Sequence, residues 1–172
     1  MSLWRHLCAI ALLPTMVALV IPSVIIHRTG ALHVGWGLPM PVTLLPPLLG
    51  CGLIALGVLL LVRTIVLFAT VGQGTLAPWD PTQRLVVQGV YRHVRNPMIS
   101  GVLSILLGEA VLLGSLPLLY WFLFFFALNA VYIPLSEEPG LVRRFGEEYL
   151  RYKANVPRWV PRLRPWNAPK RP

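Results

Sequence analysis

The residues best suited to chemistry lie in two polar clusters at the ends of apolar runs. The stretch GVYRHVRNP, residues 89–97, contains a tyrosine, two arginines and a histidine, and Glu137 and Glu138 directly follow another apolar run. A ligand with an ammonium group, a carboxylate and an apolar body would use a carboxylate, an arginine or tyrosine, and apolar walls. The pattern therefore indicates either such a binding site or a belt of side chains that only reach the membrane surface.

The apolar composition predicts the elements that position these clusters. Of the 172 residues, 56% are hydrophobic and 12% are charged, and the mean hydropathy of +0.68 is too high for an ordinary soluble domain. A helix needs about 20 apolar residues to cross a bilayer. Apolar segments lie at about 7–26, 44–71, 98–116 and 117–135. We predict an all-α integral membrane protein, a single domain over residues 1–172 with about four transmembrane helices.

The residues after the last apolar segment predict a surface helix and then an extended segment. Apolar side chains recur at helical spacing through residues 137–154, so we expect a C-terminal amphipathic helix at the membrane interface. The following PRWVPRLRPW contains prolines that prevent a helix. Its interleaved arginines and tryptophans predict an extended strap at the level of the lipid headgroups.

Positive charge predicts the orientation and the partners. The net charge is +9, but no nucleic-acid-binding motif surrounds the basic residues, so we expect membrane lipids and not nucleic acid. Arg5, three arginines in the second loop and nine basic residues in the tail contrast with Arg28 alone in the first loop. Both termini are therefore expected in the cytoplasm, at a bacterial inner membrane. His6, His27 and His33 lack metal-ligand spacing, so no metal is expected.

Several polar or small residues lie inside the apolar segments. The similar depths estimated for Arg63 and Glu109 favour an ion pair within the bundle over a role in gripping substrate. Asn129 shares one helical face with Glu137, which predicts a role for Asn129 in substrate binding. A stripe of small residues predicts close helix packing by the third span, and a tight hairpin should join it to the fourth. The stripe consists of Gly101, Ser104, Gly108 and Ser115.

Two blocks of sequence resemble a known family. RLVVQGVYRHVRNPMISG, followed one hairpin later by EEPGLVRRFGEEYLRYKANVPR, is similar to the C-terminal signature of the isoprenylcysteine carboxyl methyltransferase and phospholipid methyltransferase superfamily. The resemblance covers about residues 73–158. It implies a small integral membrane enzyme that binds S-adenosylmethionine within residues 72–158, at the cytoplasmic face. The acceptor it implies is a lipophilic molecule that enters from the bilayer.

The resemblance also assigns residues to the cofactor. The matched positions are Gln83, Leu85, Val86, Tyr91, Asn96, Pro97 and Glu137. Tyr91 matches the tyrosine of a G-x-Y motif, and Glu137 matches the glutamate that engages the amino-acid end of the cofactor. Asn96 and Pro97 stand where the family commonly has His-Pro. The sequence Gly-Gln-Gly at 72–74 is a candidate for a further cofactor motif, although a helix C-cap explains it equally well.

The sequence departs from the family pattern at three positions, and one of them bears on the acceptor. Asn96 replaces a histidine, Ile99 replaces a frequent tyrosine, and Ile133 stands where prenylcysteine enzymes place an arginine for the acceptor carboxylate. Isoprenylcysteine itself is therefore disfavoured as the acceptor, and the alternatives are a phospholipid amine, a prenylated thiol or carboxylate, or another amphiphile. An amine acceptor needs a base, for which Glu138 and His93 are the candidates.

Two other functions share this sequence pattern. Some membrane sterol reductases have the same helical scaffold and bind a nicotinamide cofactor in the same place, which makes an NADPH-dependent reductase one alternative. The other is a membrane scaffold protein without enzymatic activity, in which the polar residues only sit among lipid headgroups.

Overall fold

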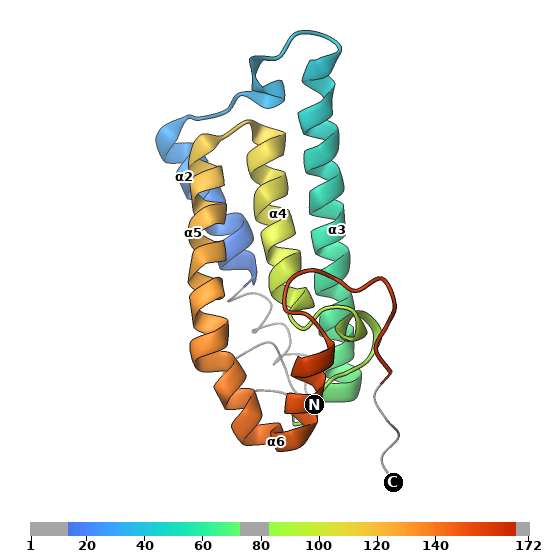
Figure 1. Ribbon diagram of the computed structural model, residues 1–172. Helices are drawn as coiled ribbons and strands as arrows, with labels where there is room; N and C mark the ends of the chain where they lie inside the picture. The colour runs from blue at the N-terminus through green and yellow to red at the C-terminus, as the bar shows by residue number, and fades with distance from the viewer. Residues whose placement is uncertain (1–13, 73–82, 168–172) are drawn as a thin grey trace.

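The protein is a bundle of helices over residues 14–72 and 83–167, the part of the chain that this computed structural model describes (Figure 1). Its elements are η1 (Met16–Val20), α2 (Ile21–Thr29), η2 (Val34–Gly37), η3 (Val42–Leu44), α3 (Leu45–Leu67), η4 (Phe68–Gly72), η5 (Gly89–Arg92), α4 (Pro97–Leu113), α5 (Leu116–Tyr132), η6 (Ile133–Glu137) and α6 (Glu138–Asn155). α4 lies between α3 and α5, and α2 packs on α5. The described residues contain no strand, so the all-α prediction is confirmed.

Two helices are long and apolar enough to cross a membrane, Val42–Gly72 and Leu116–Asn155. The shorter apolar helices are Met16–Thr29 and Pro97–Leu113. Helices therefore cover the four predicted apolar segments where the structure describes them, apart from the turn at residues 114–115 near the end of the third. The start of the first segment lies outside the described residues. Charged residues of the second long helix begin at Glu137, so we place the end of its membrane-spanning part before that residue.

The fourth predicted span and the predicted tail helix form one continuous helix, Leu116–Asn155. α5 passes into α6 through the π-helical turn η6, which contains Pro134. Proline has no amide proton for an α-helical hydrogen bond, and a wider turn accommodates its ring. The backbone leaves helical geometry later, at Gly146, where φ is 52° and ψ is −132°. Glycine adopts such positive φ values without steric cost.

α3 and α4 pack backbone to backbone through glycines. A Cβ atom added at Gly57 would lie 2.5 Å from the carbonyl oxygen of Gly101, and one at Gly50 would lie 2.7 Å from that of Gly108. The Ser104 hydroxyl donates a 2.7 Å hydrogen bond to a backbone carbonyl of α3. Small residues allow this approach, and the close packing predicted for the third span is confirmed.

The register of this packing separates Arg63 from Glu109, and their predicted ion pair is wrong. α3 and α4 are antiparallel, with Gly57 opposite Gly101, so Arg63 lies near the level of Pro97 at the start of α4. Glu109 is about 12 residues farther along α4, or roughly 18 Å at 1.5 Å per residue. Arg63 is exposed, and no ion pair joins it to Glu109 among the described residues.

Residues of the loop between α2 and α3 bind the turn between α4 and α5. Gly114 takes a left-handed conformation, with φ of 60° and ψ of 41°, and ends α4. The indole nitrogen of Trp36 donates to the Val111 carbonyl at 2.9 Å, and the backbone amide of His33 donates to the Leu113 carbonyl at 2.9 Å. These bonds occupy carbonyl groups that a helix end leaves without partners. The predicted tight hairpin is confirmed.

Candidate active site

The polar loop, residues 83–96, is covered by the C-terminal segment, residues 156–167. Three backbone hydrogen bonds of 2.9–3.0 Å join them, from the amides of Arg95, Arg162 and Trp166 to the carbonyls of Pro157, His93 and Arg92, respectively. The His93 ring adds a bond between its Nδ1 and the Arg162 carbonyl at 2.8 Å. The C-terminal segment is not helical, as predicted, and it packs on the polar loop.

Glu138 binds three basic side chains from three different segments. Its Oε1 lies 2.7 Å from Nη1 of Arg95 and 2.9 Å from Nε of Arg158, and its Oε2 lies 2.7 Å from Nζ of Lys153. The Glu138 side chain is only 2% exposed. Burial alone would raise its pKa, but hydrogen bonds from Arg158 and Lys153 and the charge of Arg95 lower the pKa below its usual value. Glu138 is therefore an ionised carboxylate with its charge compensated inside the protein.

Tyr91 is fixed within the polar loop from two sides. Its ring stacks on Phe68 of η4, with centroids 5.7 Å apart, and its carbonyl accepts a 2.7 Å hydrogen bond from the Tyr152 hydroxyl. The pKa of the buried Tyr91 phenol is raised well above its usual value, first by burial and then by Tyr152 and Glu137, with the Thr64 hydroxyl acting in the opposite direction. The phenol is therefore neutral, and the Glu137 carboxylate is close enough to influence it.

Glu137 differs from its neighbour because no basic residue pairs with it within the described residues. Its side chain is half-buried at the end of η6. Burial raises the pKa of this carboxyl, and the adjacent charge of Glu138 raises it further. A half-buried carboxylate without a counter-charge is costly for the protein alone and is suited to a cationic ligand. The charge of Glu137 thus contributes to the raised pKa of the Tyr91 phenol, and no cation compensates that charge within the described residues.

The other positions assigned to the cofactor lie along the same loop. Val86 is buried, Leu85 is half-buried and packs near Tyr152, and Gln83 is exposed. The Gln83 amide donates to the Gly72 carbonyl at 2.8 Å, which brings the polar loop back to the end of η4.

The last two assigned positions begin α4. Asn96 is the N-cap residue, and Pro97 follows it as the first helical residue, a position that suits proline because no amide proton is needed there. The Gly-Gln-Gly candidate motif at 72–74 is described only at Gly72, and its other two residues lie outside the described residues.

The predicted amphipathic tail helix is confirmed as α6, but its most buried side chains face the protein. Tyr149 and Tyr152 form a core cluster with Val156, and Leu85 and Trp166 pack against this cluster. The apolar face of the helix therefore holds the polar loop and the C-terminal segment together. The folded chain covers these residues, and the predicted position of the helix at the membrane interface stays a prediction.

Asn129 lies on the same helix as Glu137, two turns earlier. It is buried, and its side-chain nitrogen donates a 2.8 Å hydrogen bond to the Phe125 carbonyl of α5. Its predicted substrate role stays a prediction. Ile133, also on this face, is 1% exposed and supplies no polar group.

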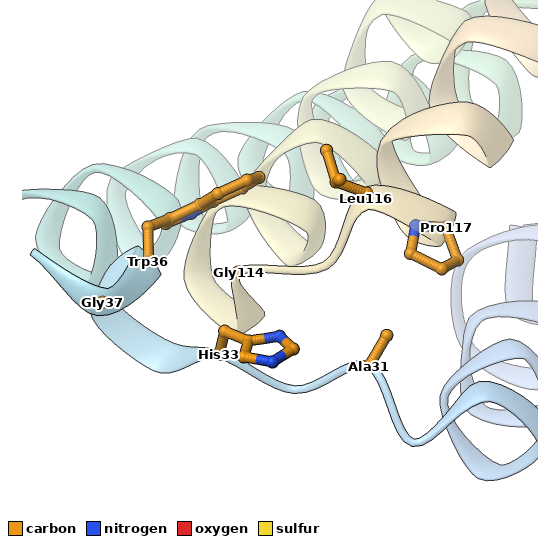
Figure 2. Close-up of a pocket in the computed structure, with 7 residues that line it drawn as sticks. All are labelled: Ala31, His33, Trp36, Gly37, Gly114, Leu116 and Pro117. Atoms are coloured by element: carbon orange, nitrogen blue, oxygen red, sulfur yellow. The ribbon is translucent and has the colours of Figure 1, made fainter.

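A separate cavity of about 330 Å³ lies at the other end of α4, beside the turn to α5 (Figure 2). Its lining residues are Ala31, His33, Trp36, Gly37, Gly114, Leu116 and Pro117. None of the residues assigned to the cofactor belongs to this lining. The cavity and the polar loop are therefore two different regions of the protein.

Comparison with known proteins identifies the family to which the chain belongs. Residues 46–148, more than half of the chain, match the phospholipid methyltransferase family. The chain belongs to this family. No curated protein and no solved structure matches it. Members of the phospholipid methyltransferase family use S-adenosylmethionine as methyl donor, so this protein is a methyltransferase with that cofactor. The family thereby decides against the reductase and the scaffold as functions.

The structure of this phospholipid methyltransferase family member reveals residues that sequence reasoning missed. Gly50 and Gly57 of α3 supply half of the glycine interface, and their seven-residue spacing was a signal that could have shown it. Lys153 and Arg158 bind Glu138. No local pattern distinguishes these two from other basic residues of the tail, because only the tertiary fold brings them to Glu138.

Proposed function

We propose that this protein transfers a methyl group from S-adenosylmethionine to the amine headgroup of a phospholipid, at the end of the bundle where Tyr91 and Glu137 meet. Three observations support this acceptor. The chain belongs to the phospholipid methyltransferase family, two of its helices are suited to span a membrane, and Ile133 offers no cation for an acceptor carboxylate. The basic residues near this end favour its placement, together with both termini, in the cytoplasm of a bacterial cell.

The observation that carries the proposal is the unpaired charge of Glu137. The Glu138 carboxylate is compensated by three cations, whereas Glu137 has none among the described residues, and its charge helps to raise the pKa of the buried Tyr91 phenol. The cofactor carries an ammonium group, for which a half-buried carboxylate is a fitting partner. Glu137 would hold that group. The Tyr91 ring and the apolar Leu85 and Val86 would border the rest of the cofactor.

The chemistry requires positioning and the removal of one proton. When bound, S-adenosylmethionine supplies an electrophilic methyl group on a sulfonium. The residues around Tyr91 would align the acceptor with that group, and the buried surroundings would exclude water from it. We assign the base to His93 and not to Glu138. The Nδ1–H of His93 is bound to the Arg162 carbonyl, which leaves Nε2 to take the proton that the amine loses, whereas the lowered pKa of Glu138 makes it a poor proton acceptor.

The acceptor is tested with the purified protein, labelled S-adenosylmethionine and vesicles of defined lipids. We expect label in phospholipids with an amine headgroup and none in a prenylated cysteine. The opposite distribution would refute the proposed acceptor without touching the identity of the cofactor.

The placement of the cofactor is tested by Glu137→Gln, with the exposed Glu147→Gln as the matched control. Binding of S-adenosylmethionine, measured by calorimetry, should weaken at least about tenfold for the first variant, which corresponds to roughly 1.4 kcal/mol. It should stay unchanged for the second. Equal affinity of a folded Glu137→Gln variant and the wild type would show that the cofactor binds elsewhere.

A further inference from the structure

The C-terminal segment lies beyond the matched family region, and yet the polar loop depends on it. The match ends at residue 148, whereas the partners of the loop in the three backbone hydrogen bonds come from residues 157–166. Aromatic contacts fix the segment at two more points. Trp159 lies 5.7 Å from Phe126 of α5, and Trp166 lies 5.9 Å from Tyr152 of α6, measured between ring centroids.

Arg158 connects this segment to the glutamate pair. Its Nε binds the same Glu138 oxygen that Arg95 of the polar loop binds, at 2.9 Å and 2.7 Å. One carboxylate oxygen thus joins the loop, the C-terminal segment and the start of α6. Because the Glu138 side chain is only 2% exposed, its negative charge would be costly without these basic partners.

The consequence concerns the next residue along the chain. The backbone position of Glu137 is set by its bonded neighbour Glu138. The backbone of Tyr91 is held by the hydrogen bond from the Tyr152 hydroxyl to its carbonyl, and the Tyr152 ring contacts Trp166. Both residues proposed to hold the cofactor are therefore connected, through one intermediate each, to the C-terminal segment.

We infer that the C-terminal segment is part of the methyl-donor site, with Arg158 as a positioning residue that holds Glu137 and Tyr91 in the arrangement that binds S-adenosylmethionine. This inference rests on the proposed function, because it takes those two residues as the cofactor contacts. Arg158 acts through Glu138 and needs no contact with the cofactor. Its loss should therefore act on the affinity for the methyl donor more than on the chemical step.

The test compares Arg158→Met with Arg164→Met, a matched change at an exposed position of the same segment. We expect Arg158→Met to raise the KM and the Kd for S-adenosylmethionine at least about tenfold, which corresponds to roughly 1.4 kcal/mol, with a smaller change in kcat. Arg164→Met should leave both constants unchanged. Arg158→Lys keeps the positive charge and should restore part of the affinity. Unchanged Kd in a folded Arg158→Met variant would overturn the inference.

A second variant covers the possibility that Arg158→Met does not fold. Trp166→Leu removes the contact with Tyr152 at the other end of the segment, and it should weaken binding of S-adenosylmethionine several-fold while circular dichroism stays that of the wild type. Wild-type binding by this folded variant would equally count against the inference. If Glu137→Gln weakens binding and both segment variants do not, only the role of the segment is wrong. If Glu137→Gln also has no effect, the proposed site itself is wrong.

Discussion

The glycine interface between α3 and α4 and the polar end formed by the loop, α6 and the C-terminal segment are stabilised by opposite means. In the interface, backbones approach so closely that no side chain fits at Gly57, and one serine adds a hydrogen bond. At the polar end, a buried carboxylate collects three cations from segments far apart in the chain. The first region depends on shape and the second on charge, so they should respond differently to mutation and to pH.

The largest effect is expected at the charged region. Glu138→Gln removes the charge that compensates Arg95, Arg158 and Lys153, and removing one member of a buried ion cluster costs about 3–5 kcal/mol. We expect a value near the lower end, because the Lys153 side chain is 41% exposed and can turn to solvent. Thermal unfolding in detergent measures the effect. Glu147→Gln, an exposed change in the same helix, should stay within about 0.5 kcal/mol of the wild type. Equal stability of the two variants would contradict this assignment.

The glycine interface should show a smaller but strictly position-dependent effect. Gly57→Ala places a Cβ atom 2.5 Å from a backbone oxygen, which the helices can relieve only by moving apart, at a cost of about 1–3 kcal/mol. Gly52→Ala is the matched control, since a Cβ there meets nothing within 4 Å. The alanine at position 52 should be neutral or slightly stabilising, because alanine favours the helix over glycine. If Gly57→Ala and Gly52→Ala change the stability equally little, the two helices do not pack at this distance.

The smallest effect, and the one that separates the two regions, is the response to pH. The folded-state pKa of Glu138 is lowered, so its contribution to stability is fully present above the unfolded pKa of about 4.3 and is lost as the pH falls through the folded value. The stability gap between wild type and Glu138→Gln should therefore narrow between pH 7 and pH 3. The difference in stability between the wild type and Gly57→Ala should stay constant over the same pH range. A Glu138→Gln gap that is independent of pH would mean that this carboxylate is not ionised in the folded protein.

Periodic packing between α3 and α4 was predicted from sequence better than a contact between two individual side chains of these helices. The stripe of Gly101, Ser104 and Gly108 repeats along one helix, and a periodic pattern is visible without knowledge of the fold. The pairing of Arg63 with Glu109 was inferred from estimated depths, and the antiparallel register of α3 and α4 showed it to be wrong. Depth along a chain says little about contact until the register of two helices is known.

The sequence by itself determined the helical membrane architecture, because apolar segments of this length must satisfy their backbone hydrogen bonds internally in lipid. It also contained the motifs that resemble the methyltransferase superfamily, since those motifs are local. Only the tertiary structure decided that Glu138 is compensated while Glu137 has no counter-charge in residues 14–72 and 83–167, and that the C-terminal segment covers the polar loop. These features depend on contacts such as Arg95 with Glu138 or His93 with Arg162, between residues 43 and 69 positions apart. Adjacent glutamates are chemically identical in sequence, and the folded chain makes them different by placing cations around one of them.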